Sequence, residues 1–131
     1  MSQLASSAAT LAERPGPRRA AKSWASLGPV ISFVEEYLGE HFTLRDLAME
    51  AEVSPFHFAR VFKQATGLTP HQYVISRRVE RARRLLAKGG RSIAAIAAET
   101  GFASQSHLTE MFRREVGMTP RAYRARFSAR E

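Results

Sequence analysis

The sequence contains no cysteine, which excludes disulfide bonds, thiolate redox sensing and cysteine ligands for metal ions. It also has no apolar run near the roughly 18 residues that indicate a membrane-spanning helix. The N-terminus lacks the continuous apolar core of a secretion signal. We therefore expect a protein of the reducing cytoplasm with no membrane partner.

Acidic residues are few compared with basic ones. The chain has 12 Asp and Glu against 20 Lys and Arg, a formal net charge of +8 over 131 residues. Such an excess favours a polyanionic partner, most often nucleic acid and sometimes an anionic membrane surface. The length is that of about one domain.

Motifs of enzyme active sites are absent as well. There is no glycine-rich phosphate loop and no serine or cysteine nucleophile motif. Glu35 and Glu36 are neighbours on the polar side of a predicted helix, so they cannot converge on one substrate. The four histidines, at positions 41, 57, 71 and 107, show no metal-ligand spacing. We expect no enzymatic activity, no metal ion, no cofactor and no small-molecule effector.

What the sequence does contain is one stretch that occurs twice. Residues 54–73 and 104–123 lie fifty positions apart and agree in Ser, His, Phe, Gly, Thr, Pro and Tyr, which indicates a duplicated structural unit. Apolar residues fall at helical spacing in both copies. They are Phe58, Val61, Phe62 and Ala65 in the first copy and Leu108, Met111 and Phe112 in the second. The residues on the opposite, exposed faces of the two helices differ between the copies. This predicts two units with the same packing and different exposed surfaces.

The pattern predicts an all-α fold of about seven helices, without strands. An amphipathic helix is expected from Pro29 onward, a second after Thr43, and a third between the cap Ser54 and Gly67. The predicted buried stripes of the first two helices are Val30, Val34, Tyr37, Leu38 and His41, then Leu44, Leu47, Ala48 and Ala51.

The second half repeats these signals after a long linking helix. That helix opens at Thr69-Pro70 and runs to about Lys88, where Gly89-Gly90 stops it; its stripe is Ile75, Val79, Ala82 and Leu86. Ser92 then caps a short helix in which Ile93, Ile96 and Ala97 repeat the spacing of the second helix. The second copy follows, and a last helix carries Tyr123 and Phe127.

We predict four parts along the chain. Residues 1–25 are expected to be a disordered basic tail, for which a transit peptide is the alternative, because both are rich in Ser, Ala and Arg. Residues 26–127 form the helical domain, with a first unit at 26–68, the linking helix at 69–88 and a second unit at 91–127. Residues 128–131 form a short C-terminal tail.

In each half a short helix, a tight turn and a second helix follow one another, the order of a helix-turn-helix unit whose second helix lies in a DNA major groove. The linking helix would be about 30 Å long at about 1.5 Å per residue. Major grooves on one side of B-DNA recur every 34–36 Å or so. A single chain could therefore read two adjacent grooves, and we expect a monomer on DNA.

Residues 54–73 and, more closely, 101–123 resemble the AraC/XylS family of bacterial transcription regulators. The Gly101-Phe102 pair and the repeated Ser, Phe, Gly, Thr-Pro and Tyr positions carry the resemblance, which covers about Pro29 to Phe127. It implies seven helices with two helix-turn-helix units, binding to promoter DNA in the bacterial nucleoid, and activation through contact with RNA polymerase. Most members carry a further sensing or dimerising domain, so the chain resembles a free-standing member or a detached DNA-binding half.

The resemblance also implies which residues read bases. They are Phe56, Ala59 and Arg60 in the first unit and Gln105, Ser106, Thr109 and Glu110 in the second. Arg60 can form a bidentate contact with guanine, and Gln105 can pair with the adenine edge. Thr109 or Phe56 can lie against a thymine methyl group, whereas the side chain of Ala59 is too short for a hydrogen bond.

Charged residues near these positions are predicted to contact bases, phosphates or one another. Glu110 stands where the family often has arginine, and it either accepts a hydrogen bond from cytosine or pairs with Arg114 one turn on. Lys63, Arg113 and Arg121 are predicted phosphate contacts. The arginines of the linking helix are expected to be mostly a solvated face.

Two classes of function remain open. One is a sequence-specific DNA-binding regulator, expected to be an activator. The other is a helical protein-interaction module of the transcription machinery that attaches to DNA only through non-specific charge.

Overall fold

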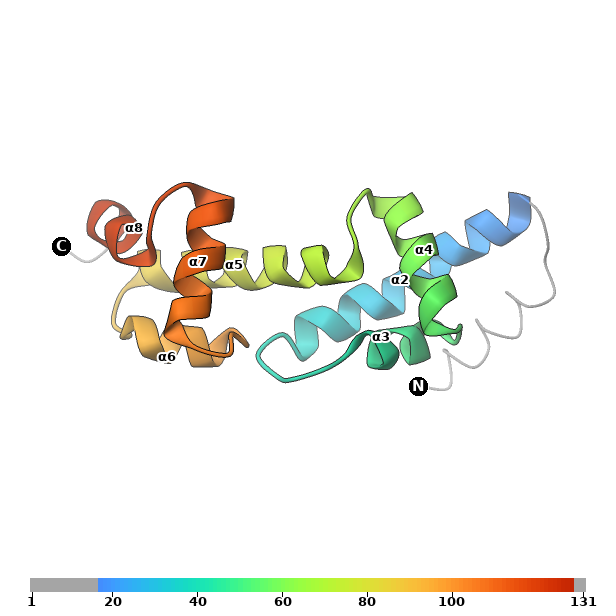
Figure 1. Ribbon diagram of the computed structural model, residues 1–131, viewed down its shortest axis with the longest axis horizontal. Coiled ribbons are helices and arrows are strands. Elements are labelled where there is room, and N and C mark those ends of the chain that lie inside the picture. Colours follow the sequence, from blue (N-terminus) through green and yellow to red (C-terminus); the bar gives the residue numbers. More distant parts are fainter. Residues whose placement is uncertain (1–16, 129–131) are drawn as a thin grey trace. The chain divides into compact units, whose positions relative to one another are not determined.

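The structure of the chain is a computed structural model that describes the backbone of residues 17–128 and the side chains of residues 27–128. The described residues form seven helices and no strand, as predicted. The helices are α2 (Pro17–Glu36), α3 (Leu44–Ala51), α4 (Pro55–Thr66), α5 (Pro70–Lys88), α6 (Ile93–Glu99), α7 (Gln105–Val116) and α8 (Pro120–Phe127) (Figure 1). Residues 1–16 of the predicted N-terminal tail, and residues 129–131, lie outside this description.

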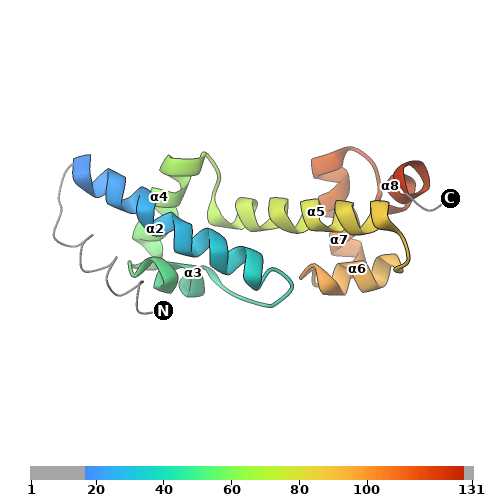
Figure 2. The ribbon, with the colours of Figure 1, turned by 180° about the vertical axis from the view of Figure 1, so that it is seen from behind.

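The chain divides into two compact units. The first comprises the chain up to Tyr37 together with Phe42–Tyr73, and the second comprises Leu38–His41 together with Val74 onward. In the first unit α2, α3 and α4 pack on one another (Figure 2). Its buried residues are Leu27, Val30, Val34, Leu47, Ala48, Ala51, Phe58 and Phe62.

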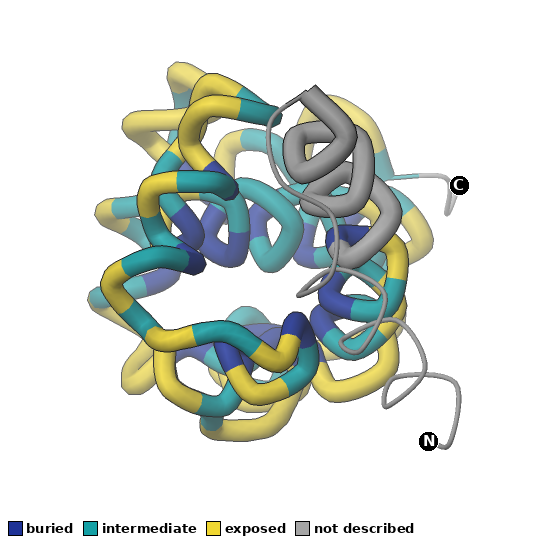
Figure 3. Tube along the Cα trace, turned by 90° about the vertical axis from the view of Figure 1, so that its right-hand side faces the viewer, coloured by how far each residue is buried: buried dark blue, intermediate teal, exposed yellow. Residues whose placement is uncertain are grey.

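The second unit has its own hydrophobic core. The predicted stripe of α5 packs with residues of α6, the following turn and α7. The buried members are Ile75, Val79, Ala82, Leu86, Ile96, Ala97, Phe102, Leu108 and Phe112. From residue 27 to 128, each helix combines buried and exposed positions, as expected of amphipathic helices (Figure 3).

The duplication extends to individual contacts. The ring centroids of Phe62 and Tyr73 lie 5.4 Å apart in a T-shaped contact, and those of Phe112 and Tyr123, fifty positions on, lie 5.5 Å apart in the same geometry. In both copies, therefore, the phenylalanine of the second helix is held by the tyrosine of the next helix.

The start of α2 differs from our prediction. We expected the helix from Pro29 onward, where its apolar stripe starts, but it begins at Pro17 and continues through Pro29. Residues 17–25, which we assigned to the tail, thus belong to a helix. Leu27 is buried together with Val30 and Val34 on one stripe. Burial of that stripe compensates for the hydrogen bond that a proline removes inside a helix.

Three residues of the predicted buried stripes are exposed. Because α2 ends at Glu36, Tyr37 and His41 lie beyond the helix, and both are exposed on the surface. Leu44 is 41% exposed because it is the first residue of α3, at the end of the stripe that Leu47, Ala48 and Ala51 bury.

Candidate nucleic-acid interface

The two candidate recognition helices begin and end in the same way. The Oγ of Ser54 accepts a hydrogen bond from the His57 backbone N–H at 3.2 Å, and Ser104 caps α7 through His107 at 3.1 Å. Each helix ends at a glycine with a left-handed backbone, Gly67 with φ 82° and Gly117 with φ 93°. These caps satisfy backbone groups at both ends of each helix. The buried Phe62 and Phe112 fix which face of each helix is exposed.

The exposed face of α4 carries the residues predicted to read bases. Phe56 is 77% exposed, a high value for a phenylalanine in a folded unit. The guanidinium carbon of Arg60 lies 5.9 Å from the centroid of that ring, so the two side chains form a cation–π pair on the surface. Ala59 is half-buried beside them. Arg60 is thereby held close to an exposed apolar ring, with its planar donors available to a base edge.

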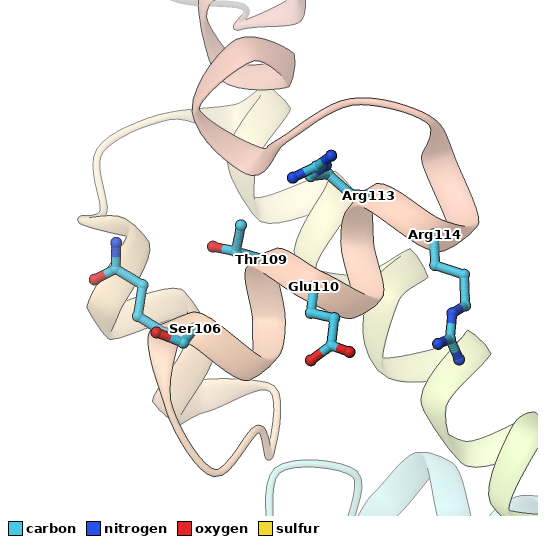
Figure 4. Close-up of a pocket in the computed structure, with 6 residues that line it drawn as sticks. Ser106, Thr109, Glu110, Arg113 and Arg114 are labelled. Carbon is cyan, nitrogen blue, oxygen red and sulfur yellow. The ribbon is translucent and has the colours of Figure 1, made fainter.

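The exposed face of α7 forms one side of an open concavity. All four predicted base-reading residues of the second unit line it, together with two arginines: Gln105, Ser106, Thr109, Glu110, Arg113 and Arg114. Figure 4 shows these side chains projecting from successive turns of α7. The concavity therefore combines amide, hydroxyl, carboxylate and guanidinium groups, which can match both base edges and phosphates.

Glu110 has no partner on its own helix in the structure. Within the described residues, its carboxylate forms no ion pair or hydrogen bond with Arg114 or any other group (Figure 4). The intrahelical pair with Arg114 is thus not formed in this structure. Glu110 is exposed, and its acceptor oxygens are available to a ligand in the concavity.

The predicted phosphate contacts are all exposed. Lys63 lies near the end of α4, Arg113 lies near the end of α7, and Arg121 is in the first turn of α8. Arg121 also lines a separate hollow of the second unit with Arg91 and Arg124. Arg124 is oriented there because its Nη1 donates a hydrogen bond to the Arg91 carbonyl at 2.7 Å.

One of the two repeated histidines packs against an aromatic ring. The His107 ring lies against Phe102 in a T-shaped contact with centroids 5.3 Å apart. No group of three or more His, Cys, Asp or Glu side chains that could hold a metal ion occurs among the described residues.

Arg78 has a structural role that the sequence did not indicate. Its Nε donates a hydrogen bond to the Leu38 carbonyl at 3.0 Å and its Nη2 donates one to the Glu40 carbonyl at 2.9 Å, within the second unit. Burial lowers the pKa of the Arg78 guanidinium from its usual value. Our expectation of a solvated arginine is thus wrong for this residue. Arg83, further along α5, forms an ion pair with Glu80 at 2.7 Å, and this pair raises the pKa of Arg83.

No helix in the described part of the chain is both long and apolar enough to cross a membrane.

Comparison with known proteins places these features in a family. Residues 47–126 match a family described as a helix-turn-helix domain. The chain is 36% identical over 100 residues to the HTH-type transcriptional activator RhaS of Escherichia fergusonii, an alignment that covers 76% of this chain and 36% of RhaS. The chain spans roughly a third of the length of the curated relatives that it matches.

Two solved structures resemble the chain over nearly their full length. The DNA-binding domain of AdpA, a global transcriptional factor solved in complex with a target DNA, is 39% identical, with a TM-score of 0.75 over 80% of this chain and 95% of that domain. A Chromobacterium violaceum regulator with an AraC-type DNA-binding domain is 32% identical, with a TM-score of 0.75 over 85% of this chain and 99% of its own. The chain belongs to the AraC/XylS family of helix-turn-helix DNA-binding domains.

Proposed function

We propose that the chain is a sequence-specific transcription regulator that places α4 and α7 in adjacent major grooves of promoter DNA. The observation that carries this proposal is the matched pair of helices. Each buries its repeated phenylalanine, Phe62 or Phe112, and exposes a different set of polar or aromatic side chains. A scaffold that was duplicated with its core retained and its outer faces changed suits the reading of two different short DNA sequences.

The length of α5 agrees with this proposal. Its 19 residues form one continuous helix of about 28 Å at roughly 1.5 Å per residue. This length is comparable with the ~34–36 Å between major grooves on one side of the duplex. A single chain that binds both grooves needs no second copy, so the proposal includes binding as a monomer to a bipartite site without a palindrome.

The proposed base contacts follow from the exposed side chains. Arg60 reads guanine, Gln105 reads adenine, and Phe56 or Thr109 contacts a thymine methyl group. Ala59, Ser106 and Glu110 complete the contact faces, while Lys63, Arg113 and Arg121 bind phosphates. None of these contacts requires a catalytic step or a cofactor.

Binding of the chain to promoter DNA is proposed to activate transcription. RhaS is named a transcriptional activator, and we assign activation to this chain on that likeness, with RNA polymerase as the protein partner. The chain would act in the bacterial cytoplasm, at the nucleoid.

The replacement Arg60→Ala tests the base-reading role of α4. We expect the affinity ratio between the best site and a site altered at one base pair to fall by about 1–3 kcal/mol, or roughly 5- to 150-fold, because one bidentate contact is lost. The measurement is a binding titration against duplexes substituted one position at a time. Gln64→Ala, at an exposed position one turn further along α4, is the matched control and should leave this ratio unchanged.

The same titration distinguishes the second class of function. A protein-interaction module attached to DNA only by charge would respond to Arg60→Ala with a small loss of affinity that is equal for all duplexes. A uniform loss of this kind would contradict sequence reading by α4.

A further inference from the structure

The basic residues are divided unequally between the two units. Leu38–His41 and Val74–Glu131, the second unit, contain 13 basic and six acidic residues, a net charge of +7. The remaining residues contain seven basic and six acidic residues, a net charge of +1. Nearly all of the excess charge of the chain therefore belongs to the second unit.

The contrast is larger among residues whose side chains the structure describes. From residue 27 onward, the first unit has three basic residues against five acidic ones, a net charge of −2. The basic residues are Arg45, Arg60 and Lys63, and the acidic residues are Glu35, Glu36, Asp46, Glu50 and Glu52. Attraction of this part of the first unit, from residue 27 onward, to a phosphate backbone is therefore weak.

Many cations of the second unit remain available to a ligand. Arg91 is paired with Glu99 at 3.0 Å and Arg83 with Glu80 at 2.7 Å. Six other cationic side chains are exposed and have no acidic partner among the described residues: Arg84, Lys88, Arg113, Arg114, Arg121 and Arg126. Ion pairing inside the unit therefore does not neutralise its excess charge.

These cations surround the second unit and are not confined to the reading face of α7. Arg113 and Arg114 line the concavity of α7, and Arg84 lines a hollow along α5. Arg121 lines the third hollow, beside Gly89 and Gly90. Contacts to phosphate are thus open to cations outside the face of α7 that carries the base-reading residues.

We infer that the second unit supplies most of the sequence-independent, salt-dependent attachment to the DNA backbone, and that the first unit contributes base discrimination with little of this attachment. The inference rests on the proposed function, because it divides the work of DNA binding between the two units. Its physical basis is counterion release: each neutralised phosphate steepens the fall of log affinity with log salt by about 0.9 in B-DNA.

Two variants with the same total charge test this division. Arg84→Gln, Arg114→Gln and Arg121→Gln together remove three charges from exposed positions of the second unit. Arg45→Glu with Gln72→Glu lowers the charge of the first unit by three. Both new glutamates lie in the first turn of a helix, where a carboxylate is favourable, so folding should be preserved.

The measurement is the affinity of the full chain and both variants for a random-sequence duplex between about 50 and 200 mM salt. The salt slope of the second-unit variant should be shallower by about 2–3, so its affinity falls about 40-fold less across that range than the affinity of the parent. The first-unit variant should keep the slope of the parent. Thermal unfolding followed by circular dichroism checks that all three proteins are folded.

Each outcome bears on one claim. Equal slope changes in the two variants, or a larger change in the first-unit variant, would overturn the division of attachment while leaving DNA binding intact. A parent chain without salt-dependent binding to any duplex would overturn the proposed function itself.

Discussion

Glu110 is the acidic side chain of an otherwise polar and basic concavity. It is exposed on α7 and has no partner among the described residues, so its carboxylate is not committed to stabilising the helix. A carboxylate near phosphates is unfavourable unless it accepts a hydrogen bond, and cytosine N4 is the base-edge donor that it fits in the major groove. Glu110 is thus a specificity residue in our proposal, with a cost in general affinity.

The variant Glu110→Gln tests this assignment. We expect weaker discrimination for a C·G pair at one position, by about 1 kcal/mol, because the glutamine amide oxygen still accepts the hydrogen bond but has no charge. Affinity for unrelated duplexes should rise, since a negative charge is removed near phosphates. Glu115→Gln, on the same helix, is the control and should leave base preference unchanged. Unchanged preference in Glu110→Gln would show that this carboxylate repels DNA without reading it.

The burial of single residues could be predicted from the sequence where the same residue occurs in both copies of the repeat. Comparison of the two copies separated the buried Phe62 and Phe112 from the changing outer positions, because a core must be kept in both units while a reading face need not be. It could not predict the role of Arg78. The partners of that side chain are backbone carbonyls at Leu38 and Glu40, which are far away in the sequence and carry no residue signal.

At the scale of elements, the two units differ by one residue in their turns. The α3 turn has Glu52 in a left-handed conformation with φ 59°, and the Val53 backbone N–H bonds to the Ala48 carbonyl at 3.1 Å. The α6 turn has Gly101 in this place, with φ 86°, and Phe102 bonds to Ala97 at 3.0 Å. Thus α6 follows α3 by 49 positions in the sequence, whereas α7 follows α4 by fifty. The same turn keeps its shape, with one residue added before α7.

Two features of the structure require a glycine at position 101: the positive φ and the close approach of neighbouring atoms. A Cβ at this position would lie 2.5 Å from the Leu38 carbonyl oxygen and 2.6 Å from the Arg78 Nε. Gly101→Ala should therefore disrupt the hydrogen bonds of Arg78 and destabilise the second unit. We expect a loss of about 2–4 kcal/mol, which combines left-handed backbone strain with overpacking.

Urea unfolding measures this loss. Gly117→Ala is the matched control, because Gly117 has φ 93° but a Cβ added there would meet no atom within 4 Å, so only the strain of about 1–2 kcal/mol applies. Equal losses in the two variants would mean that the surroundings of Gly101 adjust freely and that the close approach is unimportant.

Helix starts were predicted well where a hydroxyl residue capped them and poorly for α2, where the apolar stripe from Val30 onward was the signal. Thr43, Ser54, Ser92, Ser104 and Thr119 all cap the helices that follow them. Pro29 does not start a helix, because packing of Leu27 and its stripe favours continuation through it. Tertiary burial of this kind depends on helices that local sequence patterns do not place.

At the scale of the whole molecule, the family explains the duplicated plan, and the unequal charge of its units is a property of this sequence. Two units on one chain can read a bipartite site without a dimer, provided that α4 and α7 both recognise bases. The basic second unit would supply general attachment, and sequence recognition would then select among bound positions.

Selection of bound duplexes from a random-sequence pool, with the purified full chain at near-physiological salt, tests this plan most directly. We expect two short preferred blocks that differ in sequence and are centred about one helical turn, roughly 10–10.5 base pairs, apart. One block alone would contradict base reading by both units. No enrichment at all would contradict sequence-specific binding by this chain.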